Sequence, residues 1–115
     1  MPRGLMKPLQ VGLLGIGTVG LGTWTVLRPK AKEIARRAGR PIRITWIAER
    51  ALDRAREVTR GASDVNLTDD AAKVLTHRDI DIVVELIGGI EPARTFILQA
   101  IDNGKHVVTA NKALL

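Results

Sequence analysis

The sequence contains no cysteine, no tyrosine, one phenylalanine and two histidines among its 115 residues. Without cysteine, the chain forms neither a disulfide nor a thiolate metal site. The histidines, His77 and His106, are too few for a metal cluster built on imidazoles. No apolar run reaches the roughly 18 residues of a membrane-spanning helix, and the first residues contain no apolar signal region. We therefore expect a cytoplasmic protein with no metal and no membrane partner.

Positive charge is the main compositional bias, with 18 basic and 12 acidic residues. The excess lies between Arg28 and Arg60, which hold 11 basic and 4 acidic residues. A nucleic-acid surface is one interpretation of such a segment. However, no nucleic-acid-binding motif is present, and the tryptophans Trp24 and Trp46 lie in apolar patterns. The favoured interpretation is a solvated face near an anionic cofactor, with no nucleic-acid partner.

One glycine motif organises the rest of the chain. The apolar run Val11–Leu14 leads into Gly15-Ile16-Gly17-Thr18-Val19-Gly20, which has the spacing G-x-G-x-x-G, and a helical pattern follows. The first glycine allows a tight turn, the second lets a pyrophosphate approach the backbone, and the third lets the helix pack closely on the strand. The N–H groups at the start of that helix then face the phosphates. The motif therefore predicts a dinucleotide site rather than an ordinary structural turn.

Strand and helix patterns alternate along the chain, of which 45% is hydrophobic. Because proline lacks the N–H group that a helix needs, we expect Pro29 to divide one helical region in two. We expect a loop over Gly61–Asn66. The predicted strands are Lys7–Leu14, Ile42–Ile47, Ile80–Leu86 and Lys105–Thr109; the predicted helices are Val19–Leu27, Lys30–Ala38, Leu52–Val58, one from Ala71 to Leu75, and one opened by Glu91-Pro92 with Ala93, Phe96, Ile97, Ala100 and Ile101 on one face.

This alternation predicts an α/β fold of the Rossmann type, with a doubly wound parallel sheet. Residues 1–115 would form one NAD(P)-binding domain. We expect the domain to be incomplete, because four strands are fewer than the six of a full dinucleotide fold. Ligands bind such sheets beyond the carboxyl ends of the strands. The segments expected at that edge are Gly15–Gly20, Glu49-Arg50, Ile87–Gly89 and Thr109–Lys112.

Glu49 and Arg50 close the second predicted strand. An acid at this position binds the ribose 2′-OH of NAD, whereas an arginine accommodates the 2′-phosphate of NADP. With Arg54 and Arg56, Arg50 makes a cluster suited to anions, although a solvated charged helix is the alternative. We favour NADP, and use of both cofactors stays open.

Four further residues carry ionisable groups near strand ends. Lys112 could stabilise negative charge on a carbonyl oxygen or hold a carboxylate, or be a surface lysine without a role. Asp81 and Glu85 alternate with apolar residues, which favours structural carboxylates at a sheet edge or strand end. His106 begins a strand and is interpreted as a packing or surface residue.

Three blocks together resemble homoserine dehydrogenase: G-L-L-G-I-G-T-V-G at Gly12–Gly20, V-V-E-L-I-G-G-I-E-P-A-R at Val83–Arg94 and G-K-H-V-V-T-A-N-K-A-L-L at Gly104–Leu115. The resemblance covers the amino-terminal, nucleotide-binding part of that family. It implies reversible NAD(P)-dependent hydride transfer between L-homoserine and L-aspartate 4-semialdehyde, in threonine and methionine biosynthesis. The longer protein would take a small amino-acid substrate and form a homo-oligomer, and the 115-residue chain alone would be inactive.

The resemblance also implies roles for individual residues. Ile87 and Gly88 would flank the nicotinamide, and Arg50 would meet the 2′-phosphate. Lys112 would reach the cofactor and the reacting centre as the catalytic residue. The second strand ends in A-E-R-A-L-D instead of the more usual V-R-D-L-S, which leaves the cofactor preference open. The pyrophosphate would be lined by Gly15, Gly17, Thr18, Val19 and Gly20, and the family's T-A-N-K segment corresponds to Thr109, Asn111 and Lys112.

Other classes of protein remain as alternatives. Another NAD(P)-dependent amino-acid or semialdehyde dehydrogenase could carry the same domain. A nucleotide-binding module without chemistry is a second alternative, and nucleic-acid binding by the Arg28–Arg60 segment is a third.

Overall fold

A computed structural model describes residues 7–16, 20–60 and 62–109, and for residues 20–23 it describes only the backbone. The described residues form five strands and four helices that alternate along the chain. The strands are β1 (Leu9–Leu14), β2 (Ile42–Ala48), β3 (Asn66–Thr68), β4 (Ile82–Glu85) and β5 (His106–Thr109). The helices are α1 (Gly20–Ala38), α2 (Leu52–Val58), α3 (Ala71–Leu75) and α4 (Ala93–Asp102).

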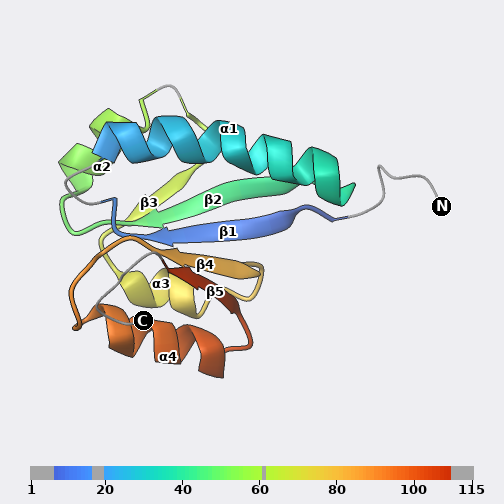
Figure 1. Ribbon diagram of the computed structural model, residues 1–115. Coiled ribbons are helices and arrows are strands. Elements are labelled where there is room, and N and C mark those ends of the chain that lie inside the picture. Colours follow the sequence, from blue (N-terminus) through green and yellow to red (C-terminus); the bar gives the residue numbers. More distant parts are fainter. Residues whose placement is uncertain (1–6, 17–19, 61, 110–115) are drawn as a thin grey trace.

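The strands form one parallel sheet in the order β3-β2-β1-β4-β5. Helices α1 and α2 cover one face, and α3 and α4 cover the other (Figure 1). The chain therefore winds outward from β1 in both directions. This arrangement confirms the predicted doubly wound α/β fold of the Rossmann type.

Alternating side chains of β1 supply the two halves of the core. Val11 and Leu13 pack with Trp24 of α1 and Val58 of α2. Leu14, one residue further along the strand, packs instead with α3 and α4. Because successive side chains of a strand point to opposite faces, one apolar strand stabilises both helical layers. Val11, Leu13 and Leu14 are each at least nine-tenths buried.

The prediction that Pro29 divides a helix was wrong, because α1 runs through it from Gly20 to Ala38. Pro29 is exposed, on the side of the helix that faces solvent. A proline inside a helix removes one backbone hydrogen bond, at a cost of about 3 kcal/mol. Trp24 is buried beneath the helix and Leu27 packs against the same cluster, so tertiary contacts of α1 offset that cost.

The prediction of four strands was also wrong, because β3 forms at the end of the segment predicted as a loop. Only three residues long, it pairs in parallel with the carboxyl half of β2. Its register is supported by the Asn66 side-chain amide, which donates to the carbonyl of Thr45 over 3.1 Å. The strand therefore depends on a partner about 20 residues away rather than on an apolar pattern of its own.

The predicted apolar face of α4 was correct for four of its five members. Ala93 and Ala100 are fully buried, and Phe96 and Ile97 are half-buried. Ile101 was assigned wrongly, since its exposed fraction is 55%. Near the end of the helix, Ala100 belongs to the core cluster that includes Leu14 and Val83, whereas the next residue, Ile101, points to solvent.

Candidate functional site

The carboxyl ends of β1, β2, β4 and β5 meet at one edge of the sheet, because all the strands run parallel. We call this the cofactor edge; among the described residues it includes Gly15, Glu49-Arg50, Ile87-Gly88 and Thr109. At its centre, β1 pairs with β2 on one side and β4 on the other. The direction of winding reverses between β1 and β4, which is where doubly wound sheets bind ligands.

Gly15 leaves β1 at this reversal point in a conformation with φ +78°. Its N–H donates to the carbonyl of Ala48 at the end of β2, over 2.7 Å. A Cβ atom at this position would come within 2.9 Å of Ile87 Cγ1 and 3.3 Å of Ile87 Cα. Glycine is therefore required both by the backbone conformation and by the close approach of the segment that follows β4.

Helix α1 begins at Gly20 and presents its amino end toward the cofactor edge. A helix of 19 residues carries unpaired N–H groups and partial positive charge at that end, which suits an anion. Around Gly88, on the other side of the edge, no heavy atom beyond its chain neighbours lies within 4 Å of an added Cβ. A helix start and an open glycine turn at one edge fit a dinucleotide, with its phosphates toward α1.

The Glu49 carboxylate binds two backbone N–H groups. Its Oε1 accepts from Ile16 N over 3.0 Å, and its Oε2 accepts from Ala51 N over 2.9 Å. It thereby joins the glycine segment to the turn between β2 and α2. The sequence suggested Glu49 as a ribose ligand, but its spacing from the glycines could not show this bridge.

Arg50, next to Glu49, has an exposed side chain at the end of β2. Within the cluster suggested by the sequence, Arg56 pairs with Asp53 over 3.0 Å. In the same basic segment, Arg28 pairs with Asp64 and Arg37 with Glu33. These pairs fit a solvated charged face better than a surface of uncompensated charge for nucleic acid.

Glu85 joins two other parts of the cofactor edge. It ends β4, and its exposed fraction is 1%. Oε1 accepts from the Thr109 hydroxyl over 2.6 Å, and Oε2 accepts from Gly88 N over 2.9 Å. It is a strand-end carboxylate, as the sequence suggested. It does not lie on an outermost strand, because β4 is between β1 and β5. The sequence signal for it was a single carboxylate in an otherwise apolar run.

The structure thus brings together six predicted cofactor residues at one edge: Gly15, Gly20, Arg50, Ile87, Gly88 and Thr109. Gly17, Thr18, Val19, Asn111 and Lys112 lie outside the described residues. His106 is exposed at the opposite edge, in agreement with its interpretation as a surface residue. Asp81 has a structural contact, since its Oδ2 accepts from Gln10 N over 2.9 Å.

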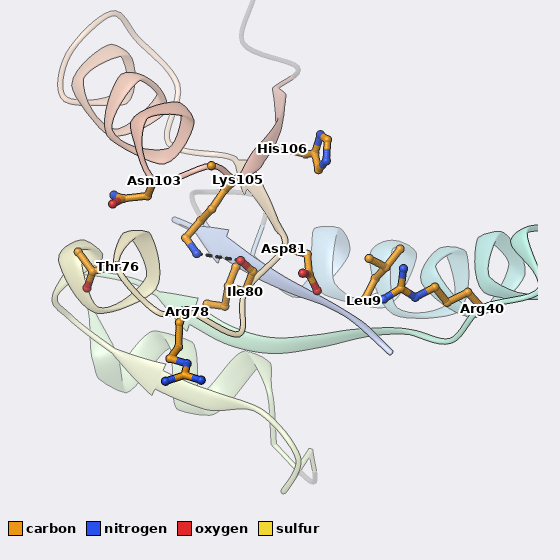
Figure 2. Close-up of a pocket in the computed structure, with 10 residues that line it drawn as sticks. Leu9, Arg40, Thr76, Arg78, Ile80, Asp81, Asn103, Lys105 and His106 are labelled. Atoms are coloured by element: carbon orange, nitrogen blue, oxygen red, sulfur yellow. Dashed lines mark hydrogen bonds between the residues drawn. The ribbon is translucent and has the colours of Figure 1, made fainter. Parts of the chain in front are cut away.

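A hollow of about 570 Å³ lies at the opposite edge of the sheet, near the amino ends of β1, β4 and β5. Figure 2 shows Lys105 reaching from the start of β5 to the Ile80 carbonyl, a hydrogen bond of 2.8 Å. Burial lowers the pKa of the Lys105 ammonium, and the nearby carboxylates of Asp81 and Asp79 oppose this change. Lys105 donates to backbone carbonyls of the turn before β4, and Asp81 accepts from the backbone of Gln10 in β1, so both have the contacts of structural residues.

Two further structural observations concern membranes and metals. Within the described part of the chain, the helices are too short or too polar to cross a membrane. Residues 7–16, 20–60 and 62–109 include no group of three or more His, Cys, Asp or Glu side chains placed to hold a metal ion.

The sheet order, the glycine turn after β1 and the start of α1 define a dinucleotide-binding domain of the Rossmann class. Comparison with known proteins gives the family. The profile described as "Homoserine dehydrogenase, NAD binding domain" matches residues 15–115. The chain belongs to this family, and its cofactor is a nicotinamide dinucleotide.

Individual relatives agree with this assignment. The chain is 64% identical over 110 residues to a homoserine dehydrogenase of Methylobacillus glycogenes, covering 96% of this chain and 26% of that protein. It is 48% identical to the protein of that name in Neisseria gonorrhoeae, covering 96% and 25%. The crystal structure of a homoserine dehydrogenase from Thiobacillus denitrificans is 60% identical with a TM-score of 0.82, covering 95% and 25%. The chain thus spans about a quarter of the length of these relatives.

Proposed function

We propose that this chain is the cofactor-binding part of an NAD(P)-dependent homoserine dehydrogenase, which interconverts L-homoserine and L-aspartate 4-semialdehyde. The observation that carries the proposal is the position of Gly15, at the point where the sheet reverses and directly before the segment that leads into α1. The names of the relatives supply the substrate. The cytoplasmic location and the homo-oligomeric state expected from the sequence belong to the same proposal.

The two halves of the sheet would hold the two nucleotides of the cofactor. In doubly wound folds, the group that meets the adenosine ribose follows β2, and each half of the sheet binds one nucleotide. The adenosine half would therefore lie over β1, β2 and β3. The nicotinamide half would lie over β4 and β5, beside Ile87, Gly88 and Thr109. The pyrophosphate would lie between them against Gly15, Gly17, Thr18, Val19 and Gly20.

NADP is the proposed preferred cofactor. Both carboxylate oxygens of Glu49 already accept backbone hydrogen bonds, which leaves Glu49 fewer free acceptor positions for a ribose diol. The neighbouring Arg50 is exposed and offers a guanidinium with the geometry to bind a phosphate through two N–H groups. This combination favours the 2′-phosphate over the 2′-OH.

The chemistry of the reaction belongs to the bound cofactor, whose nicotinamide ring accepts or returns a hydride. The residues of this chain would hold the ring in place and exclude water from one side of it. Lys112, with Asn111 close by in sequence, is the proposed group for negative charge at the reacting carbonyl oxygen. The substrate must also be held in near-attack geometry. No second set of groups suited to an amino acid lies at the described part of the cofactor edge, so we expect the 115-residue chain to bind cofactor without turnover.

Cofactor binding can be tested on the chain itself by following backbone amide shifts in NMR during titration with NADPH. We expect the largest shifts at Gly15, Gly20 and Gly88. Asn103 and His106, at the opposite edge, serve as internal controls and should hardly move. Shifts confined to these two and their neighbours would contradict the proposed site. Turnover of homoserine by the purified chain would contradict the expected inactivity.

A further inference from the structure

Glu85 places a negative charge inside the nicotinamide half of the cofactor edge. Its side chain is buried, and its carboxylate oxygens accept hydrogen bonds from Gly88 N and the Thr109 hydroxyl. These partners are 21 residues apart in sequence: Gly88 lies in the segment after β4, and Thr109 is the last residue of β5. Removing a carboxylate from water is costly, so a buried carboxylate in an apolar strand requires a physical explanation.

The two hydrogen bonds do not themselves require a negative charge. A glutamine has the same shape, and its amide oxygen could accept from Gly88 N. Its NH₂ group could donate to the Thr109 oxygen, since a hydroxyl also accepts hydrogen bonds. A neutral side chain could therefore join the same two segments without the cost of burying a charge. Positioning alone explains the contacts of Glu85 but leaves its charge unexplained.

The cofactor provides a use for the charge. An oxidised nicotinamide ring carries one positive charge, whereas the reduced ring is neutral. A carboxylate that is shielded from water interacts with such a ring more strongly than an exposed one, because the surrounding dielectric constant is lower. A buried charge beneath Gly88 and Thr109 would therefore act differently on the two redox forms.

We propose that Glu85 favours binding of the oxidised cofactor over the reduced cofactor, while it also positions Gly88 and Thr109. The inference rests on the proposed function, because it takes the nicotinamide to lie over β4 and β5. It adds a specificity-determining role to a residue that does not itself belong to the glycine motif.

The test is the ratio of two dissociation constants, Kd for NADPH divided by Kd for NADP⁺, measured by calorimetry on the 115-residue chain. Glu85→Gln keeps the side-chain shape and removes the charge. We expect it to lower this ratio by about fivefold or more, the scale of a partly screened interaction between unit charges. A role in positioning alone would weaken both forms equally and leave the ratio unchanged.

Asp81→Asn is the matched control. Asp81 lies just before the same strand and also accepts from a backbone N–H group, but at the opposite edge. Removing its charge should leave the ratio within about twofold of the unaltered chain, because the charge is screened over that distance. A fall of equal size in both variants would show a general effect of net charge and would overturn the inference.

Thr109→Val provides a second test that keeps the charge of Glu85. It deletes the hydroxyl that donates to Oε1 and so leaves the carboxylate less neutralised. Both cofactors should bind more weakly, while the ratio stays the same or rises. A falling ratio would overturn the inference even if Glu85→Gln did not fold. If the unaltered chain bound neither cofactor form, the proposed function itself would fail; binding with an unchanged ratio in Glu85→Gln would refute only the role of Glu85.

Discussion

Replacing Gly15 with alanine should destabilise the protein more than the same change at any open glycine turn. The new Cβ would need a backbone with φ +78°, which costs a residue other than glycine about 1–2 kcal/mol. It would also lie 2.9 Å from Ile87 Cγ1 and 3.3 Å from Ile87 Cα. Because part of this contact is with backbone, a change of side-chain rotamer cannot relieve it, and overpacking of this kind costs about 1–3 kcal/mol. The expected loss is therefore about 2–5 kcal/mol in the free energy of unfolding.

Gly39→Ala isolates the steric part of this loss. Gly39 follows α1 with φ +68°, and nothing lies within 4 Å of its added Cβ. Both variants share the backbone strain and the effect of alanine on the unfolded chain. The difference between them should therefore be the contact with Ile87, about 1–3 kcal/mol. Urea unfolding followed by circular dichroism measures both values. Equal losses at the two positions would refute the steric argument.

Gly15→Ala should also affect the cofactor, since Ile87 precedes Gly88 at the proposed nicotinamide site. If the variant folds, NADPH should bind more weakly than to Gly39→Ala under the same conditions. Normal affinity in a folded Gly15→Ala variant would show that the contact between the glycine segment and Ile87 is irrelevant to binding.

Three other changes test the remaining parts of the structure. Arg50→Ala should weaken NADPH binding more than NADH binding, by about 1.5–3 kcal/mol in calorimetry; equal losses would contradict the assignment to the 2′-phosphate. In a protein of the relatives' length that carries this domain, Lys112→Ala should lower kcat/KM for homoserine about 10²-fold or more, with a smaller change in cofactor affinity; near-normal turnover would show that the chemistry lies elsewhere. Burial lowers the pKa of Lys105 in the folded chain. Between that lowered pKa and the ordinary value of 10.5, the unfolded chain therefore binds more protons than the folded chain. The stability of the unaltered chain relative to Lys105→Met should rise with pH over this range. Denaturant titrations at several alkaline pH values measure this, and a stability difference that stays constant with pH would contradict the argument.

Two carboxylates, Glu49 and Glu85, show why a site can be located from sequence before its contacts can be known. Position at strand ends placed both Glu49 and Glu85 near the cofactor edge. Which N–H groups they bind depends on how the turns after β1, β2 and β4 come together. For Glu49 the structure adds a bridge between Ile16 and Ala51, which its position at a strand end could not predict.

Local patterns were sufficient for the order of most elements and for the doubly wound fold. The bounds of α2 at Leu52–Val58 agree with the prediction, and β4 lies inside the predicted run Ile80–Leu86. Such patterns are informative because a strand or helix buried in a sheet needs apolar residues at fixed periods. The turn at Gly15 was equally readable, since a positive φ angle favours glycine locally.

Tertiary contacts decided what local patterns could not. The strand β3 exists because β2 offers it an edge, and α1 continues past Pro29 because its buried face packs on the sheet. In a regular strand, Ile44 and Trp46 would lie on one face of the sheet, because they are two residues apart. A register shift opposite Val11 and Gly12 puts Ile44 against the cluster under α1 and Trp46 against the cluster under α3 and α4. Each of these outcomes depends on residues distant in sequence, whose contact energies outweigh the local preferences of the chain.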